Sequence, residues 1–326
     1  MDFQPTEDQQ HLRAGVRDLL AGRYGREALR ASVDAAAGGG AGAGAGGAAG
    51  VDRALWRELG GAGFFALRLP ESEGGVGLGL PEAVLVFEEA GRALVPGPLV
   101  ATHLAAGVVP GAADGTAVVT AFDLDGPLVA HLGDADAVLG AAAVPAGEPV
   151  RSVDPLTPLH RVAAAGDVSA YRATGALLTA ALQLGSALRT VELAVRYAGE
   201  REQFGQPIGA FQAVKHLCAR MLVRAEVART AVYAAAVTGD PGEGAAAKLL
   251  ADEAAVQGAR DCLQVHGGMG FTWEADVHLH LKRAWVRAEQ WRTAAQAQEL
   301  LAEELLAEAL LAEALLAEEL PATAAP

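Results

Sequence analysis

The sequence predicts a mainly α-helical protein with a short β region in its middle. Alanine and leucine, which form helices readily, are abundant, and only 5% of the residues are aromatic. Amphipathic segments occupy both ends of the 326-residue chain, whereas short apolar runs separated by Gly, Pro and Asp occupy residues 111–170. We therefore expect an N-terminal helical domain over residues 1–110, a reduced middle β region over 111–170, and a C-terminal four-helix bundle with a terminal extension over 171–320.

The first expected helix covers residues 6–33. Thr6 can cap its start, and four apolar side chains recur on one face, namely Leu12, Val16, Leu19 and Leu20. Residues 35–50 contain only Ala and Gly, which cannot pack and lose much backbone entropy on ordering, so we expect a loop. A phosphate-binding loop is the alternative, but no strand precedes it and no Gly-Lys-Ser/Thr follows. Two more helices are expected over 51–63 and 81–94.

The sequence pattern of the second half of the chain predicts long helices joined by short loops, which is typical of an up-and-down bundle. We expect these helices over residues 171–200, 209–238, 243–265 and 276–319. The tail repeats Leu-Leu-Ala-Glu every five residues, and five residues advance a helix by about 500°. The Leu pairs therefore form no single coiled-coil seam, and we expect a helical extension that contacts a partner.

The bulk composition excludes several classes of protein. The formal net charge of −15 argues against a nucleic-acid surface, which needs clustered Lys and Arg. The two cysteines, Cys218 and Cys262, make neither a disulfide framework nor a metal site, so we expect a reduced, cytoplasmic location. The N-terminus is charged and unlike a signal peptide, and no apolar run reaches the about 20 residues that a membrane span needs.

A first segment that can carry chemistry reads EREQFGQPIGAFQAVKHLCARM over residues 200–221. A helix ends near Arg201, breaks at Gly205, Gln206 and Pro207, and restarts. Such a break presents backbone N–H groups and an arginine at a helix terminus, which suits an anion such as a pyrophosphate. By itself the segment fits an ordinary helix hairpin with an arginine on its rim better than it fits an anion site.

A second segment reads CLQVHGGMGFT over residues 262–272. A helix stops at the pair Gly267 and Gly268, where the chain can approach a ligand closely, and Gln264 and His266 precede the stop. By itself this pattern is also an ordinary glycine helix stop.

Together, the two segments resemble the acyl-CoA dehydrogenase family. The resemblance covers the N-terminal helical part and the chain from about residue 175 to 293. It implies an N-terminal helical domain, a middle β domain and a C-terminal four-helix bundle, with FAD held partly by a neighbouring subunit. The residues that match the family's FAD-binding positions are Arg201, Gln203, Phe204, Gln212, Gln264, Gly267, Gly268 and Thr293.

The resemblance also implies a reaction, the α,β-dehydrogenation of an acyl-CoA thioester, with electrons passed to an electron-transfer flavoprotein. A carboxylate removes the α proton, and a hydride leaves the β carbon for the flavin. Such a base works in an apolar pocket, where desolvation raises its pKa. Hydrogen-bond donors must also stabilise the charge that develops on the thioester oxygen.

The position of this base departs from the common family pattern. Most members carry it in a Tyr-Glu-Gly-Thr motif, and the matching stretch here, residues 289–293, has Trp291 in place of the Glu. A minority, resembling isovaleryl-CoA dehydrogenase, carry the base on the preceding helix, and that match falls on Glu253. We therefore predict Glu253 as the catalytic base. The alternatives are Glu289, a base supplied by a partner, or an exposed Glu253 without a catalytic role.

The middle region departs as well, because it is much shorter than in complete family members. Residues 111–170 contain no tryptophan and no Thr-Glu-Pro turn. In this the chain resembles the shortened subunit of actinobacterial heteromeric acyl-CoA dehydrogenases that act on steroid side-chain thioesters. That resemblance implies a heterotetramer with a related longer chain and FAD shared at the interface. Three alternatives stay open: a non-catalytic subunit that completes the partner's FAD site, an oxidase or monooxygenase, and a helical scaffold without flavin.

Overall fold

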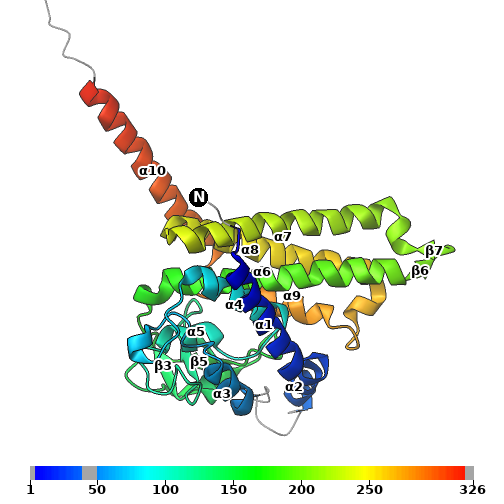
Figure 1. The fold of residues 1–326 in the computed structure, drawn as a ribbon, viewed down its shortest axis with the longest axis horizontal. Helices are drawn as coiled ribbons and strands as arrows, with labels where there is room; N and C mark the ends of the chain where they lie inside the picture. Colours follow the sequence, from blue (N-terminus) through cyan, green and yellow to red (C-terminus); the bar gives the residue numbers. More distant parts are fainter. Residues whose placement is uncertain (1–3, 39–49, 320–326) are drawn as a thin grey trace, which may run out of the picture.

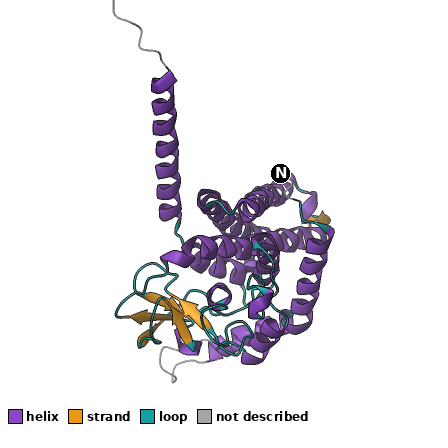
Figure 2. Cartoon of the chain, turned by 60° about the vertical axis from the view of Figure 1, so that its left-hand side comes forward, coloured by secondary structure: helices purple, strands orange, loops and turns teal. Residues whose placement is uncertain are grey.

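The structure, a computed structural model, describes residues 4–38 and 50–319 and confirms the mainly helical fold (Figure 1, Figure 2). The N-terminal helices are α1 (Glu7–Arg23), α2 (Arg26–Gly38), α3 (Arg53–Gly61), α4 (Leu80–Arg92) and α5 (Leu99–Ala105). The strands of the middle region are β1 (Val119–Ala121), β2 (Leu128–Ala130), β3 (Ala137–Leu139), β4 (Gly147–Val150) and β5 (Leu159–Val162). The long C-terminal helices are α6 (Ser169–Glu200), α7 (Gln212–Thr238), α8 (Pro241–His266), α9 (Val277–Ala288) and α10 (Ala294–Glu319).

The first helix begins where the sequence predicts, at a capping box. The Thr6 hydroxyl accepts a hydrogen bond from the backbone N–H of Gln9 at 3.3 Å, and the Thr6 N–H donates to Gln9 Oε1 at 2.9 Å. The expectation of one helix over 6–33 is wrong, because the chain breaks between α1 and α2 at Tyr24 and Gly25. Tyr24 leaves the helical conformation with φ −131° and buries its ring, and glycine is a weak helix former.

The alanine–glycine run and the proline-rich stretch after α4 also differ from expectation. Residues 35–38, the start of the expected loop, belong to α2, and residues 39–49 lie outside the described residues. The short helix α5 was not expected, because Pro96 and Pro98 stand just before it and conceal its apolar pattern. It is almost wholly buried, so tertiary packing stabilises a helix too short to form by itself.

The middle region is a small β structure, as predicted. Strand β1 pairs in parallel with β3, and a second sheet has the antiparallel order β2-β5-β4. Both lie against the N-terminal helices at one end of the molecule (Figure 1, Figure 2). Strand β1 is buried along its whole length, so this region shares one hydrophobic core with the helices.

The bundle is organised around α6, which lies between α4 and α8 (Figure 1). Two glycines allow α4 and α6 to touch backbone to backbone. A Cβ added at Gly91 would lie 2.0 Å from the carbonyl oxygen of Leu182, and one added at Gly185 would lie 1.8 Å from that of Glu88. Any larger residue at either position would push the two helices apart.

The expectation of one helix over 276–319 is also wrong. Helix α9 ends at Ala288, and α10 begins at Ala294. Between them Trp291 adopts φ +62° and is only 2% exposed. Burial of the indole redirects the chain, so α10 projects from the body (Figure 1). The described Leu side chains on its outer part are 62–67% exposed, as expected for a repeat without a seam; they are Leu305, Leu306, Leu310 and Leu311.

Two searches of residues 4–38 and 50–319 gave negative results. No helix in these ranges is long and apolar enough to cross a membrane. No group of His, Cys, Asp and Glu side chains in them is arranged to hold a metal ion.

Candidate active site

The structure brings the two predicted segments together at one end of the bundle. The first forms the hairpin of β6 (Glu202–Gln203) and β7 (Gln206–Pro207), and the second ends in the 3₁₀ helix η4 (Gly267–Phe271). The ring of Tyr197, just before the hairpin, stacks on the ring of His266, just before η4, with centroids 4.1 Å apart and 20° between planes. A separate small hydrophobic core supports this end of α6, α7, α8 and α9.

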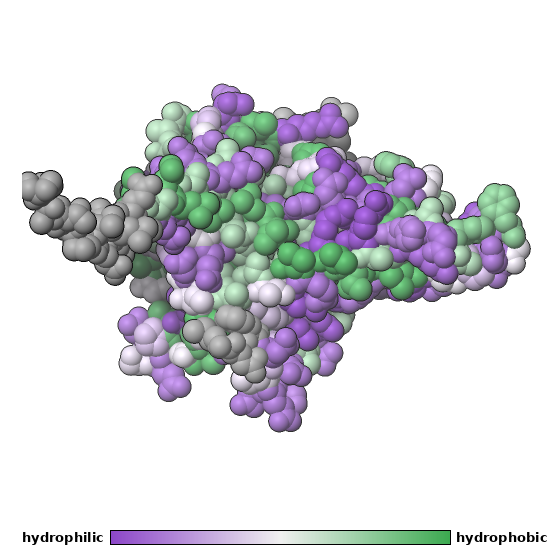
Figure 3. All heavy atoms as spheres, turned by 90° about the horizontal axis from the view of Figure 1, so that it is seen from above, coloured by the Kyte–Doolittle hydropathy of each residue, from purple (hydrophilic) through white to green (hydrophobic). Residues whose placement is uncertain are grey.

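The hairpin projects beyond the bundle and carries exposed side chains (Figure 1, Figure 3). Backbone bonds fix its base: the N–H of Ile208 donates to the carbonyl of Arg201 at 2.8 Å, and the N–H of Arg201 donates to that of Tyr197 at 2.8 Å. At its tip Phe204 adopts φ +56° and is 93% exposed. A strained backbone that holds an apolar ring in water indicates a surface that another molecule covers.

The glycine stop leaves open space beside the backbone. Gly267 has φ +58°, which favours glycine, and a Cβ added at Gly267 or Gly268 would meet no atom within 4 Å. The His266 ring is held by a contact of 2.8 Å between its Nδ1 and the carbonyl of Cys262. The side chain of Gln264 is exposed on the preceding turn.

These residues fit the group that the family resemblance implies. The end of the bundle offers an exposed guanidinium at Arg201, amide side chains at Gln203, Gln212 and Gln264, an exposed aromatic ring, and glycines that a ligand can approach. Arginine and amide donors suit a pyrophosphate, and an aromatic ring suits a flat heterocycle. FAD has both parts. The structure therefore supplies a surface of the right chemistry, open on the side that a second chain would close.

Thr293 lies apart from this group, beyond the far end of α9. Helix α9 has 12 residues and spans about 18 Å, and Thr293 follows it. Its hydroxyl accepts from the N–H of Gln296 at 3.3 Å, while Gln296 Oε1 accepts from the N–H of Thr293 at 3.1 Å. Thr293 therefore caps α10.

The predicted base, Glu253, lies on the exposed face of α8. Its neighbour Asp252 is buried and binds Lys248, and it accepts from Gln183 Nε2 at 2.9 Å. The alternative base, Glu289, is also exposed. Water reaches both glutamates, so the desolvation that a base requires is not supplied by the packing of this chain.

A buried tryptophan fills the position at which most family members carry the base. Trp291 lies against α6, where a Cβ added at Gly175 would be 2.3 Å from the indole ring. The N–H of Trp291 donates to the carbonyl of Asp123 at 2.5 Å, so the same segment is bound to the middle region. The adjacent cavity is about 30 Å³, the space of one water molecule. An acyl chain has no room there.

Sequence reasoning missed the polar residues around this small cavity. Asp123 is half-buried and accepts from Gln290 Nε2 at 2.8 Å, while its buried Oδ1 has no hydrogen-bond partner in the described part of the chain. Burial raises the pKa of Asp123 to about 7 and lowers the pKa of His131 to about 3. Arg283 binds the buried Asp154. No local signal identifies these residues, because Asp123 lies in an ordinary turn sequence and its burial depends on α9.

We predict that the free energy of unfolding of the Asp123→Asn variant, measured relative to that of the wild type, is higher at pH 8 than at pH 4. The unfolded carboxyl loses its proton near pH 4 and the folded one near pH 7, so the wild type loses stability as pH rises between these values. The amide side chain does not titrate. Urea unfolding at both pH values measures the difference, and an equal effect at both would contradict the raised pKa.

Comparison with known proteins shows the family of the chain. A model of the acyl-CoA dehydrogenase N-terminal domain matches residues 6–119, and one of the C-terminal domain matches residues 173–310. The chain is 37% identical over 304 residues to the acyl-CoA dehydrogenase IpdE2 of Mycobacterium tuberculosis, covering 86% of this chain and 92% of that protein. It is 34% identical over 301 residues to IpdE2 of Mycolicibacterium smegmatis, with 86% and 93% covered.

Solved structures have the same fold. The ChsE4-ChsE5 complex from Mycobacterium tuberculosis matches with a TM-score of 0.77 at 25% identity, covering 94% of this chain and 99% of that one. A variant of the Tcur3481-Tcur3483 steroid ACAD matches with a TM-score of 0.78 at 24% identity, covering 93% and 99%. The chain therefore belongs to the acyl-CoA dehydrogenase family and is a FAD-dependent oxidoreductase of that family.

Proposed function

We propose that this chain is the shortened subunit of a heteromeric acyl-CoA dehydrogenase and completes a FAD site with a related, longer chain. The substrate class is an acyl-CoA thioester, with a steroid side chain as the acyl group on the strength of the resemblance to the heteromeric enzymes. An electron-transfer flavoprotein is the proposed electron acceptor.

One observation supports the proposal: Tyr197 and His266 stack, so the two segments predicted to bind FAD lie at one open end of the bundle. The side chains there face solvent, with Phe204 93% exposed. The middle region does not cover them, because it lies against the N-terminal helices, away from the β6–β7 hairpin (Figure 1). A second chain is the natural cover. The similar ChsE4-ChsE5 structure is, by its title, a complex of two chains.

In this mechanism bound FAD would supply the acceptor for the hydride of the β carbon. Arg201 and the amides of Gln203, Gln212 and Gln264 would hold its polar part, and Gly267 and Gly268 would let it approach the backbone. The carboxylate of Glu253 would take the α proton after the partner has covered it and removed water. Covering also strengthens every hydrogen bond in the site, because it lowers the local dielectric constant.

A second candidate function is a subunit that holds the partner's FAD and carries no base. The burial of Trp291 against Gly175 favours it, because the space for an acyl chain is closed. Glu253→Gln in the assembled enzyme separates the candidates, with Glu299→Gln on α10 as a matched exposed control. Loss of activity with FAD retained identifies Glu253 as the base. Unchanged activity removes Glu253 from the role of base, and Glu289→Gln then separates a base in this chain from one in the partner.

The test of the shared site is the flavin content of the chain alone and of the chain co-expressed with a related longer chain. We expect little FAD in the first case and about one FAD per pair in the second, read from visible absorbance. One FAD per chain in the isolated protein would sink the proposal of a shared site.

A further inference from the structure

A second cavity, distinct from the flavin-binding end, lies between the N-terminal helices and the bundle. Its volume is about 410 Å³, and its walls come from α1, α2, α4, α6 and α9. Ligand sites in proteins span about 300–1,000 Å³, so the cavity has the size of a small-molecule site. None of the predicted FAD-binding or catalytic residues lines it.

The wall is unusually rich in arginine for a chain of net charge −15. Five arginines line the cavity: Arg17, Arg26, Arg92, Arg189 and Arg196. Within the described part of the chain they form ion pairs with three carboxylates. Glu89 binds Arg17, Asp276 binds Arg26, and Glu192 binds both Arg92 and Arg189. The cavity therefore carries an excess of positive charge, which attracts an anion.

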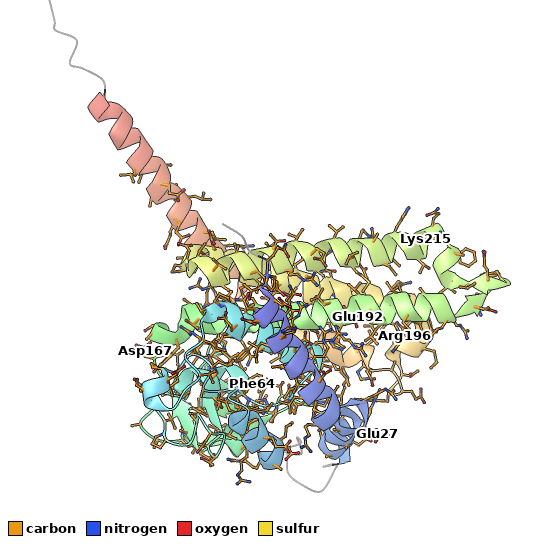
Figure 4. The ribbon with its side chains drawn as sticks, viewed as in Figure 1. Glu27, Phe64, Asp167, Glu192, Arg196 and Lys215 are labelled. Atoms are coloured by element: carbon orange, nitrogen blue, oxygen red, sulfur yellow. The ribbon has the colours of Figure 1, made fainter. Side chains whose placement is uncertain are left out.

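Arg196 is the arginine that is available to a ligand. It lies about one turn after Glu192 on α6 (Figure 4) and forms no ion pair with any carboxylate in the described ranges. Arg92 and Arg189 are already held by Glu192, at 2.6 Å and 3.1 Å, so their guanidinium groups are fixed in place. A pre-positioned cluster with one free member is suited to binding an oxyanion through two or more N–H groups.

His280 adds a neutral hydrogen-bond donor at the base of the cavity. It is 3% exposed, and its Nδ1 lies 2.7 Å from the Ser186 hydroxyl. Burial, together with Arg189 and Arg287, lowers the pKa of His280 to about 3, so the ring is neutral. Ser186 has no other hydrogen-bond acceptor among the described residues, so it donates to Nδ1. The Nε2 then carries the hydrogen and has no bonded partner in this part of the chain.

The remaining wall is apolar. Leu20 and Leu29 are buried and come from α1 and α2, Leu94 follows α4, and Leu193 comes from α6. An inorganic anion would make no apolar contact with these side chains, whereas a molecule with an apolar body would bury their surface and gain affinity from it. The chemistry on the wall is that of an amphipathic oxyanion.

We propose that this cavity binds a small organic oxyanion with an apolar body, held by Arg196 and its neighbours through a carboxylate or phosphate group. Both groups can accept two parallel hydrogen bonds from a guanidinium, so the arginines are expected to bind either of them. The ligand is distinct from FAD, and the cavity is a site in its own right.

Calorimetric titration of the full chain with octyl phosphate, octanoate and inorganic phosphate tests the proposal. We expect saturable binding of at least one octyl ligand at about one site per chain, and binding at least about tenfold tighter than that of inorganic phosphate. The tighter octyl ligand identifies the headgroup as phosphate or carboxylate. No saturable binding of either octyl ligand at concentrations up to about 5 mM would overturn the proposal.

Variants locate the site. Arg196→Gln should weaken binding by about tenfold or more, because it removes a charge-assisted contact. Arg161→Gln, an exposed arginine on β5, makes the same charge change elsewhere and should leave binding within about twofold. Equal weakening by both variants would overturn the assignment. Arg189→Gln is a second variant, since Arg92 still holds Glu192.

The flavin content of the same variants separates this site from the proposed function. Arg196→Gln should retain FAD in the assembled enzyme. Loss of FAD in this variant would mean that the cavity belongs to the flavin site, and it would overturn the proposal of a separate ligand. If the chain proves to bind no FAD at all, octyl ligand binding is still measurable, so the two proposals can fail independently.

Discussion

Replacing Trp291 with alanine is expected to lower the free energy of unfolding by about 3–5 kcal/mol, the usual cost of removing a large buried aromatic ring. The indole is 2% exposed and packs against Gly175, where a side chain of any other residue would collide with the ring. Its backbone also joins the bundle to the middle region through Asp123. Loss of the ring therefore leaves a cavity at the junction of two parts of the fold, and neither part can collapse into it without moving the other.

Urea unfolding measures this effect, and Trp273→Ala is the matched control. Trp273 is 58% exposed; Lys282 Nζ lies 4.4 Å from the centroid of its ring, and the His278 ring packs edge-on against it with centroids 4.9 Å apart. Such exposed contacts contribute about 0.5–1.5 kcal/mol each, so the control should lose clearly less stability than Trp291→Ala. A loss of under about 1 kcal/mol for Trp291→Ala would show that the site collapses easily. The burial of Trp291 would then be no argument against an acyl pocket.

Gly268→Leu is expected to weaken FAD binding by about 100-fold or more and to leave the fold intact. In the chain alone a Cβ at Gly268 meets nothing within 4 Å, so the fold accepts the side chain. A flavin nucleotide that approaches the backbone here would collide with it. The expectation rests on the proposed role of the glycine pair.

Flavin fluorescence titration of the assembled enzyme gives the affinity, and the midpoint of urea unfolding gives the stability. Gly61→Leu is the control, because Gly61 is an exposed glycine near the end of α3 with open space around it. Both variants should unfold at similar urea concentrations, and only Gly268→Leu should lose FAD. Normal FAD affinity in Gly268→Leu would remove the glycine pair from the site.

The sequence was enough to predict features that depend on neighbours along the chain. The cap at Thr6 and the apolar stripe of α1 were predicted, since both involve residues three or four apart. The small β region was also predicted from short apolar runs between turn-forming residues. The two segments predicted to bind FAD were recognisable because their glycines and prolines stand at fixed places in a family pattern. Each of these signals is local, and local energetics suffice to produce it.

The sequence was not enough where distant residues compete with helix propensity. It gave one helix over 276–319, but Trp291 is more stable buried between α6 and the middle region than exposed on a continuous helix. It gave one helix over 6–33, but burial of Tyr24 breaks it. In both cases a large aromatic side chain is buried by residues far away in the chain, and no periodicity within the helix reports that.

The sequence by itself thus determined the fold class and the family, and it predicted the residues that bind FAD, because each follows from residue types at fixed spacings. The tertiary structure decided which of them share a surface: it joined Arg201 and Gly267 at one end through the Tyr197–His266 stack and placed Thr293 beyond the other end of α9. It also exposed Glu253, filled the common base position with Trp291 and gathered five arginines around a cavity. The physical reason is that burial and electrostatic environment depend on what packs against a residue, and only the folded chain specifies those neighbours.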